Sequence, residues 1–177
     1  MPGMRGFSAL CLALLLACMP QVAAARVSLA FHSFTGSILH GRYPHAFIAL
    51  TGTLEGSGRR VAENYGYTPV SLSPAIFEGN VPAKIHVEGR KYLAMTNRHF
   101  AVPLSDAQYR AVVAEVRRWR DGPGVARYNL HTNNCIHFVA HIAAMVGLRV
   151  DFPDGMALRP KEWLDHVAAM NPQLAAP

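Results

Sequence analysis

The chain has 177 residues, a formal net charge of +6 and a sequence pI near 9.6. Its basic residues occur as scattered pairs such as Arg59-Arg60 and Arg117-Arg118. No basic stripe with interleaved aromatic residues is present, so we expect no nucleic-acid partner. Hydrophobic residues make up 51% of the chain, which suits a single domain with a proper core.

Residues 1–25 have the features of a secretory signal peptide. Arg5 precedes an apolar run over residues 7–19, and residues 23–25 offer an Ala-x-Ala cleavage site. The apolar run is short for a membrane span. We therefore expect residues 26–177 to form one exported domain, periplasmic or secreted.

The three cysteines are divided between this segment and the domain. Cys11 and Cys18 belong to the signal segment, which leaves Cys135 as the lone thiol of the exported chain. A lone thiol in an oxidising compartment is either buried or used. A second interpretation keeps Cys18: residues 15–18 resemble a bacterial lipobox, and a lipid on Cys18 would tether a lipoprotein to the membrane.

Alternating and apolar runs predict strands in the first half of the chain, over residues 26–34, 45–50, 59–68, 83–87 and 90–96. Residues 51–58 carry three glycines and are expected to form a hairpin loop. Residues 69–82 contain three prolines and are expected to be an irregular connection. Strands followed by helices favour an α+β fold.

Helices are predicted in the second half. Ser105 and Gln108 form a capping box before an apolar helical face, and the turn at residues 121–124 ends that helix. A last helix is expected over residues 160–170, and residues 148–152 are expected to be extended.

The most distinctive stretch surrounds Cys135. Asn133 or Asn134 is a good N-cap for a helix that ends at Gly147, so Cys135 lies in the first turn. The free N–H groups there favour a thiolate and are expected to lower the pKa of the thiol. Helical spacing places Cys135 on the same side as Phe138, facing the body of the protein. Cys135 is therefore a candidate nucleophile.

A thiol nucleophile needs a base, and His45 is the best placed histidine. It begins an apolar strand directly after a proline turn, so its side chain can extend from the sheet edge toward a packed helix. A purely structural role for this histidine is the alternative.

Two motifs carry a family resemblance. Pro44-His45-Ala46-Phe47-Ile48-Ala49-Leu50, followed far downstream by Asn133-Asn134-Cys135-Ile136-His137-Phe138-Val139, resembles the circularly permuted papain-like hydrolases related to NlpC. That group includes the YiiX-like and lecithin:retinol acyltransferase-like proteins. The resemblance implies an antiparallel sheet packed against a helix that bears the nucleophile. It also implies Cys135 as the nucleophile and His45 as its base.

The resemblance further implies a third polar residue on the strand after His45, which means Asn64, Glu63 or Thr68. If residues 55–58 form a tight hairpin, pairing parity places Asn64 and Thr68 on the face of His45 and Glu63 on the other face. Asn64 is the preferred candidate.

An oxyanion would need fixed donors near the nucleophile. The backbone N–H of Cys135 and the side chains of Asn134 and Tyr128 are the candidates. For Asn134, simple helix capping is an equally good interpretation.

Zinc is the chemical rival, because His131, Cys135, His137 and His141 supply ligands within a short stretch. Cys135 lies well around the helix from His137 and His141, which would strain a shared tetrahedral site. We therefore expect no metal and no other cofactor.

The sequence thus predicts an exported cysteine hydrolase that cleaves amide bonds, with cell-wall peptides as first substrate. A lipid esterase or acyltransferase of the same fold is one alternative, with an ester substrate. A non-catalytic envelope-binding protein with a buried cysteine is the other.

Overall fold

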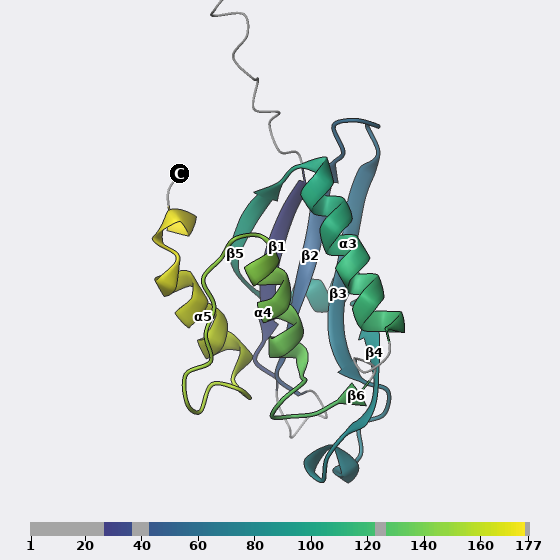
Figure 1. The fold of residues 1–177 in the computed structure, drawn as a ribbon, viewed down its shortest axis with the longest axis vertical. Coiled ribbons are helices and arrows are strands. Elements are labelled where there is room, and N and C mark those ends of the chain that lie inside the picture. Colours follow the sequence, from purple (N-terminus) through teal and green to yellow (C-terminus); the bar gives the residue numbers. More distant parts are fainter. Residues whose placement is uncertain (1–26, 37–42, 123–126, 176–177) are drawn as a thin grey trace, which may run out of the picture.

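The computed structural model describes residues 27–36, 43–122 and 127–175. Its strands form one antiparallel six-stranded sheet in the order β5-β1-β2-β3-β4-β6 (Figure 1). The strands are β1 (Val27–Phe34), β2 (His45–Thr53), β3 (Arg60–Pro69), β4 (Val81–His86), β5 (Asn97–Leu104) and β6 (Arg127–Tyr128). The helices are α2 (Arg90–Leu93), α3 (Asp106–Asp121), α4 (Cys135–Met145) and α5 (Pro160–Met170), with 3-10 turns η2 (Pro74–Phe77) and η3 (Pro172–Ala175). The predicted α+β class is confirmed.

The predicted signal segment, residues 1–25, and the lipobox with Cys18 lie outside the described residues. Within the described ranges, no helix combines the length and the apolar character that a membrane crossing requires.

The central strands owe their positions to alternating apolar residues. Leu29 pairs with Leu50 and Phe31 pairs with Ile48 across β1 and β2, so these four side chains share one face of the sheet. All four are fully buried. Because side chains alternate along a strand, the neighbours of these residues in the chain, such as Phe47 next to Ile48, belong to the opposite face.

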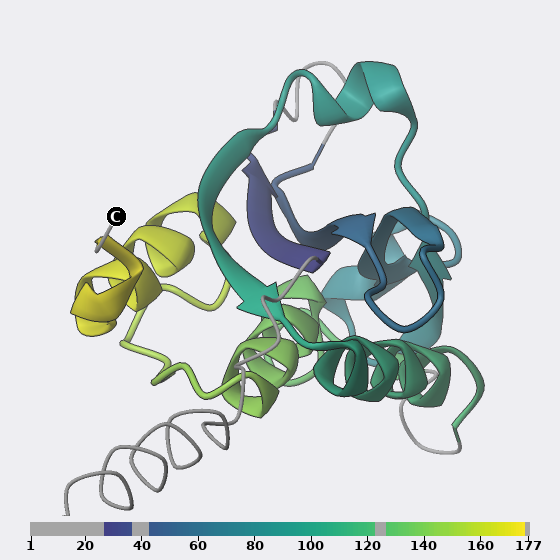
Figure 2. The ribbon, with the colours of Figure 1, turned by 90° about the horizontal axis from the view of Figure 1, so that it is seen from above.

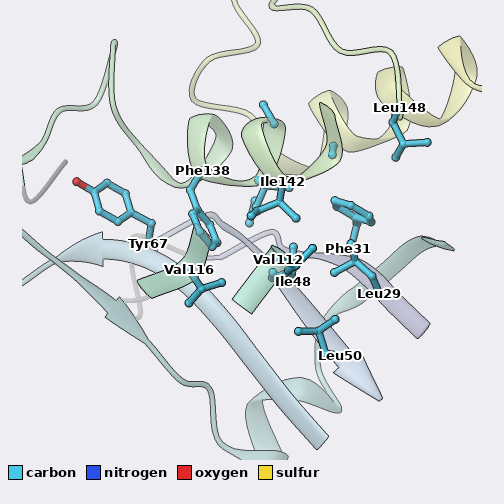
Figure 3. Close-up of a cluster of buried hydrophobic side chains, with 14 of the residues drawn as sticks. Leu29, Phe31, Ile48, Leu50, Tyr67, Val112, Val116, Phe138, Ile142 and Leu148 are labelled. Carbon is cyan, nitrogen blue, oxygen red and sulfur yellow. The ribbon is translucent and has the colours of Figure 1, made fainter. Parts of the chain in front are cut away.

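Helices α3, α4 and α5 cover the first face (Figures 1 and 2). Phe138 and Ile142 of α4 extend toward the sheet, where Ile48 and Phe31 meet them (Figure 3). Each such side chain contributes about 1.5–3 kcal/mol when it is removed from water. This packing places the N-terminus of α4 against β2 and β3.

The predicted capping box of α3 and the predicted asparagine cap of α4, which is Asn134, are both confirmed. The Ser105 side chain accepts from the backbone N–H of Gln108, and the Gln108 side chain accepts from the Ser105 N–H, at the start of α3. Helix α5 begins at Pro160 and ends at Met170, as predicted.

The opposite face is covered by the connection from β4 to β5. Strand β4 pairs with β3 and β5 pairs with β1, so this connection crosses the sheet on the side away from the long helices (Figure 2). Tyr92 of α2 packs there on Phe34 and Phe47, with ring centroids 4.9 and 6.2 Å apart. We name residues 87–96 the crossing segment.

The predicted strand over residues 90–96 is therefore wrong. Residues 90–93 form α2, and the strand β5 starts only at Asn97. A local pattern of apolar residues predicts a buried face, and here a helical turn rather than a strand packs the half-buried Tyr92 against the far face. Two smaller differences are that residues 148–152 form no strand and that Arg127–Tyr128 do.

A chain of polar side chains, buried at its Ser33 end, ties α5 to the sheet. Ser33 Oγ lies 2.7 Å from His99 Nε2, and His99 Nδ1 lies 2.8 Å from Asp165 Oδ1. The order of groups is that of a serine hydrolase triad. Ser33 is fully buried beneath the helices, however, so substrate cannot reach its hydroxyl, and the chain serves to fix α5.

Candidate functional site

Cys135 is the first residue of α4, and Asn134 is its N-cap. The Asn134 side-chain oxygen accepts from the N–H groups of Ile136 and His137, at 2.8 and 3.3 Å. The amide of Asn134 donates to the carbonyl groups of Leu130 and Ala157, at 2.6 and 2.8 Å. Since a side-chain amide has two hydrogens, both of which are used, Asn134 acts as a cap and retains no donor for an oxyanion.

The thiol of Cys135 is buried and surrounded by donors. Hydrogen bonds from the backbone N–H groups of Ala46 and Ile136 and from the Tyr128 hydroxyl act to lower its pKa. Burial acts in the opposite direction and is the larger effect, so the pKa of Cys135 is raised. The expectation of a lowered pKa is therefore corrected: the donors are present, but the thiol is neutral at rest.

Tyr128 of β6 supplies the side-chain donor. Its hydroxyl is hydrogen-bonded both to the thiol and to the backbone N–H of Cys135. Burial raises the pKa of Tyr128, so the hydroxyl keeps its proton at neutral pH. The Tyr128 hydroxyl and the Cys135 N–H thus lie together beside the sulfur and are hydrogen-bonded to each other in the resting site.

His45 lies on β2 immediately before Ala46, whose N–H reaches the thiol. The pairing of Phe47 with Gly66 and of Ala49 with Asn64 confirms the predicted parity, which puts Asn64 and Thr68 on the face of His45 and Glu63 on the other. The imidazole lies over Gly66. Burial and then His86 lower the pKa of His45 to about 4, so the ring is neutral at neutral pH.

Glu88 is the charged group nearest to His45, and the sequence analysis did not identify it. Its Oε1 lies 4.0 Å from His45 Nε2, and its Oε2 lies 3.6 Å from His86 Nε2. Burial raises the pKa of this carboxyl. Glu88 lies in the turn after β4, where a glutamate followed by glycine reads as ordinary surface, so no sequence signal distinguished it.

The preferred third residue, Asn64, lies on the expected face but contacts the backbone of Glu88. Its amide donates to the Glu88 carbonyl at 3.1 Å and its oxygen accepts from the Glu88 N–H at 2.6 Å. Glu63 accepts from the hydroxyl of Tyr109 on α3, and Thr68 lines the cavity described next.

Cys135 and His45 line the same cavity of about 330 Å³. Tyr128, Thr68 and Glu88 also line it. His86 and Asn134 line it too, and the remaining wall is mainly apolar and comes from Tyr43, Pro44, Pro69, Leu72, Ile76, Phe77, Tyr92, Leu130, Ile136, Ala157, Leu158 and Pro160. Tyr43, Leu72, Phe77 and Leu158 are solvent-exposed, so the apolar wall continues to the surface. The site is therefore a cleft with a polar end at the thiol and an apolar rim.

The histidines of the zinc alternative lie apart. His137 contacts Asn134 and stacks on Phe152, while His141 pairs with Glu115 at 3.0 Å. His131 is exposed. Among the described residues, no group of three or more histidine, cysteine or acidic side chains is arranged to hold a metal ion.

Comparisons of the chain with models of protein families, with curated proteins and with solved structures find no match. The resemblance to permuted papain-like hydrolases accordingly stays a prediction that rests on the two sequence motifs.

Proposed function

We propose that this protein is an exported cysteine hydrolase of permuted papain-like fold, in which Cys135 attacks the carbonyl carbon of an acyl substrate. The observation that carries the proposal is the shared cavity: Cys135 and His45 come from different elements and line one cleft. The donors around the sulfur, from Ala46, Ile136 and Tyr128, support it.

The resting pair is a neutral thiol and a neutral imidazole, because burial raises the pKa of Cys135 and lowers that of His45. His45 therefore acts as a general base: it takes the thiol proton as the sulfur–carbon bond forms. It then gives this proton to the leaving alcohol or amine. Water, deprotonated by His45, hydrolyses the thioester and restores the thiol.

The negative charge that develops on the carbonyl oxygen needs donors already in place. The Tyr128 hydroxyl and the backbone N–H of Cys135 lie beside the sulfur, and they would exchange their present bonds to the sulfur and to each other for bonds to the carbonyl oxygen. Removal of one such donor in other hydrolases costs about 100- to 1000-fold in kcat.

The cleft favours an apolar acyl group. Leu72, Phe77 and Leu158 are exposed at its rim, where they would contact a hydrocarbon chain rather than the charged peptides of a cell wall. This observation favours the lipid esterase or acyltransferase alternative over the cell-wall amidase. Both share the same chemistry at Cys135.

A series of p-nitrophenyl esters of increasing acyl length tests the proposal. We expect hydrolysis that requires Cys135 and His45, with kcat/KM rising from acetate to octanoate. Mass spectrometry of the stopped reaction should show one acyl group on Cys135. The variants Cys135→Ala and His45→Ala should each lose at least about 100-fold in kcat/KM, the scale of general base catalysis.

Equal slow turnover by wild type and Cys135→Ala would sink the hydrolase and leave an envelope-binding protein with a buried cysteine. A Cys135-dependent rate that falls with acyl length, together with cleavage of peptidoglycan fragments, would return the cell-wall amidase.

A further inference from the structure

The imidazole of His45 has one nitrogen without a hydrogen bond. Its Nε2 atom is buried and no group among the described residues bonds to it. A buried polar atom left in this state costs free energy, so its retention calls for a reason. The nearest carboxylate oxygen is Oε1 of Glu88, at 4.0 Å.

Glu88 is held rigidly in this place. Asn64 clamps its backbone through two hydrogen bonds, one to the N–H and one to the carbonyl group. The Glu88 side chain is only 10% exposed and is shared between two histidines, with Oε1 toward His45 and Oε2 toward His86. Asn64 therefore positions the backbone of Glu88.

Space for this contact is provided by Gly66. A Cβ atom at that position would lie 2.4 Å from His45 Nε2, which no structure tolerates without displacement of the ring. Three features therefore meet between His45 and Glu88: the missing side chain of Gly66, the Glu88 backbone held by Asn64, and the buried Nε2 atom without a partner.

We propose that Glu88 is the positioning residue of His45: its carboxylate accepts a hydrogen bond from Nε2–H and stabilises the imidazolium formed during catalysis. This inference rests on the proposed function. A hydrogen on Nε2 leaves Nδ1 as the basic nitrogen that takes the thiol proton. The separation of 4.0 Å would shorten as the ring becomes charged, as catalytic contacts do when substrate binds.

The test compares Glu88→Gln with Glu63→Gln and His45→Ala. Glutamine at position 88 keeps the backbone groups that Asn64 clamps and keeps an oxygen that can accept from Nε2, but it removes the charge. Glu63 lies on the other face of the same sheet, so Glu63→Gln controls for the loss of the charge of a half-buried glutamate.

The primary measurement is kcat/KM for p-nitrophenyl octanoate from about pH 3 to pH 8, a range that includes the pKa of His45 at about 4. We expect Glu88→Gln to lose at least about tenfold in kcat, equivalent to one pKa unit of imidazolium stabilisation, with KM nearly unchanged. The acid limb should move to lower pH, because removal of a negative charge lowers the pKa of His45. His86, Tyr92 and Tyr43 also face this region, and all three remain in every variant.

Glu88→Asp is a second test of the role of the charge, since it keeps the carboxylate on a shorter side chain. We expect it to retain the wild-type acid limb with an intermediate kcat. A purely structural role would instead lower stability in all Glu88 variants and leave the acid limb of the surviving enzyme in place.

The outcomes separate the two proposals. If His45→Ala is inactive but Glu88→Gln matches wild type in kcat and in its acid limb, the role of Glu88 is overturned and the hydrolase stands. If the wild type shows no turnover that depends on Cys135, the hydrolase fails. An NMR titration of the His45 ring then decides the contact alone: equal pKa values in wild type and Glu88→Gln overturn it.

Discussion

Gly66 shows how one missing side chain shapes the candidate site. It pairs with Phe47 across β2 and β3, directly below the imidazole of His45. An added Cβ would meet both His45 Nε2, at 2.4 Å, and Phe47 Cβ, at 3.2 Å. The ring of His45 would have to turn away from Glu88, because the backbone of a central strand cannot shift freely.

At this scale we predict that Gly66→Ala lowers kcat/KM for the octanoate ester by at least about tenfold, since ångström-scale misplacement costs that much or more. The free energy of unfolding should fall by about 1–3 kcal/mol from overpacking. Gly89→Ala is the matched control, because nothing lies within 4 Å of a Cβ there and its φ of −73° suits alanine. Equal activity of Gly66→Ala and Gly89→Ala would contradict this account of the ring.

At the scale of elements, the N-terminus of α4 is joined to the start of α5 through Asn134. Its amide reaches Ala157, which lines the cleft three residues before Pro160. Ser105 caps α3 through the same kind of capping box but contacts no second element through its side chain. A comparison of the two caps therefore distinguishes the effect of capping alone, at Ser105, from the effect of capping combined with a contact to a second element, at Asn134.

We predict that Ser105→Ala costs about 1 kcal/mol of stability, as a lost N-cap does, and that Asn134→Ala costs about 2–4 kcal/mol because buried carbonyl groups also lose their donors. Urea unfolding at pH 7.5 measures both. Asn134→Ala should also lower kcat/KM by misplacing Cys135, whereas Ser105→Ala should leave it unchanged. Similar losses of stability in the two variants would show that the contact with Ala157 contributes little.

The elements themselves were predictable to different degrees. Three helices have local signals in the sequence: a capping box begins α3, a polar cap precedes the apolar face of α4, and a proline stands in the first turn of α5. The crossing segment has no such signal: Tyr92 packs on Phe34 and Phe47, which are distant from it in the sequence. For the same reason Glu88 was missed, since its partner His45 is distant in sequence, whereas parity correctly placed Asn64.

For the whole molecule, buried neutral histidine links stability to pH. The pKa of His45 is about 4 in the folded protein and 6.5 in an unfolded chain. Between these values the unfolded chain binds a proton that the folded protein does not bind. The stability is thus complete above pH 6.5 and is lost as the pH falls toward 4. His32, whose pKa is also lowered to about 4 by burial and by Arg98, acts in the same direction.

We predict that the free energy of unfolding, measured with urea, falls by about 3 kcal/mol between pH 6.5 and 4 through His45 alone, at 1.36 kcal/mol per unit. His45→Gln should flatten this dependence, and His32→Gln should flatten it in part. His131→Gln, at an exposed position, is the control. A slope in His45→Gln as steep as in wild type would show that His45 is protonated in the folded protein.

The crossing segment also has a consequence for how the chain folds. Strands β1 to β4 are neighbours both in the sequence and in the sheet, so β1, β2 and β3 each pair with the strand that follows in the chain. Strand β5 pairs instead with β1, from which β2, β3 and β4 separate it in the sequence. Bringing two such distant segments together costs more chain entropy before any of their contacts form. Glu88 and Tyr92 belong to the crossing segment, so they reach their final positions when β5 pairs with β1. Refolding protein should therefore form the pairing of β1 to β4 first, and the complete surroundings of His45 only when β5 joins the sheet.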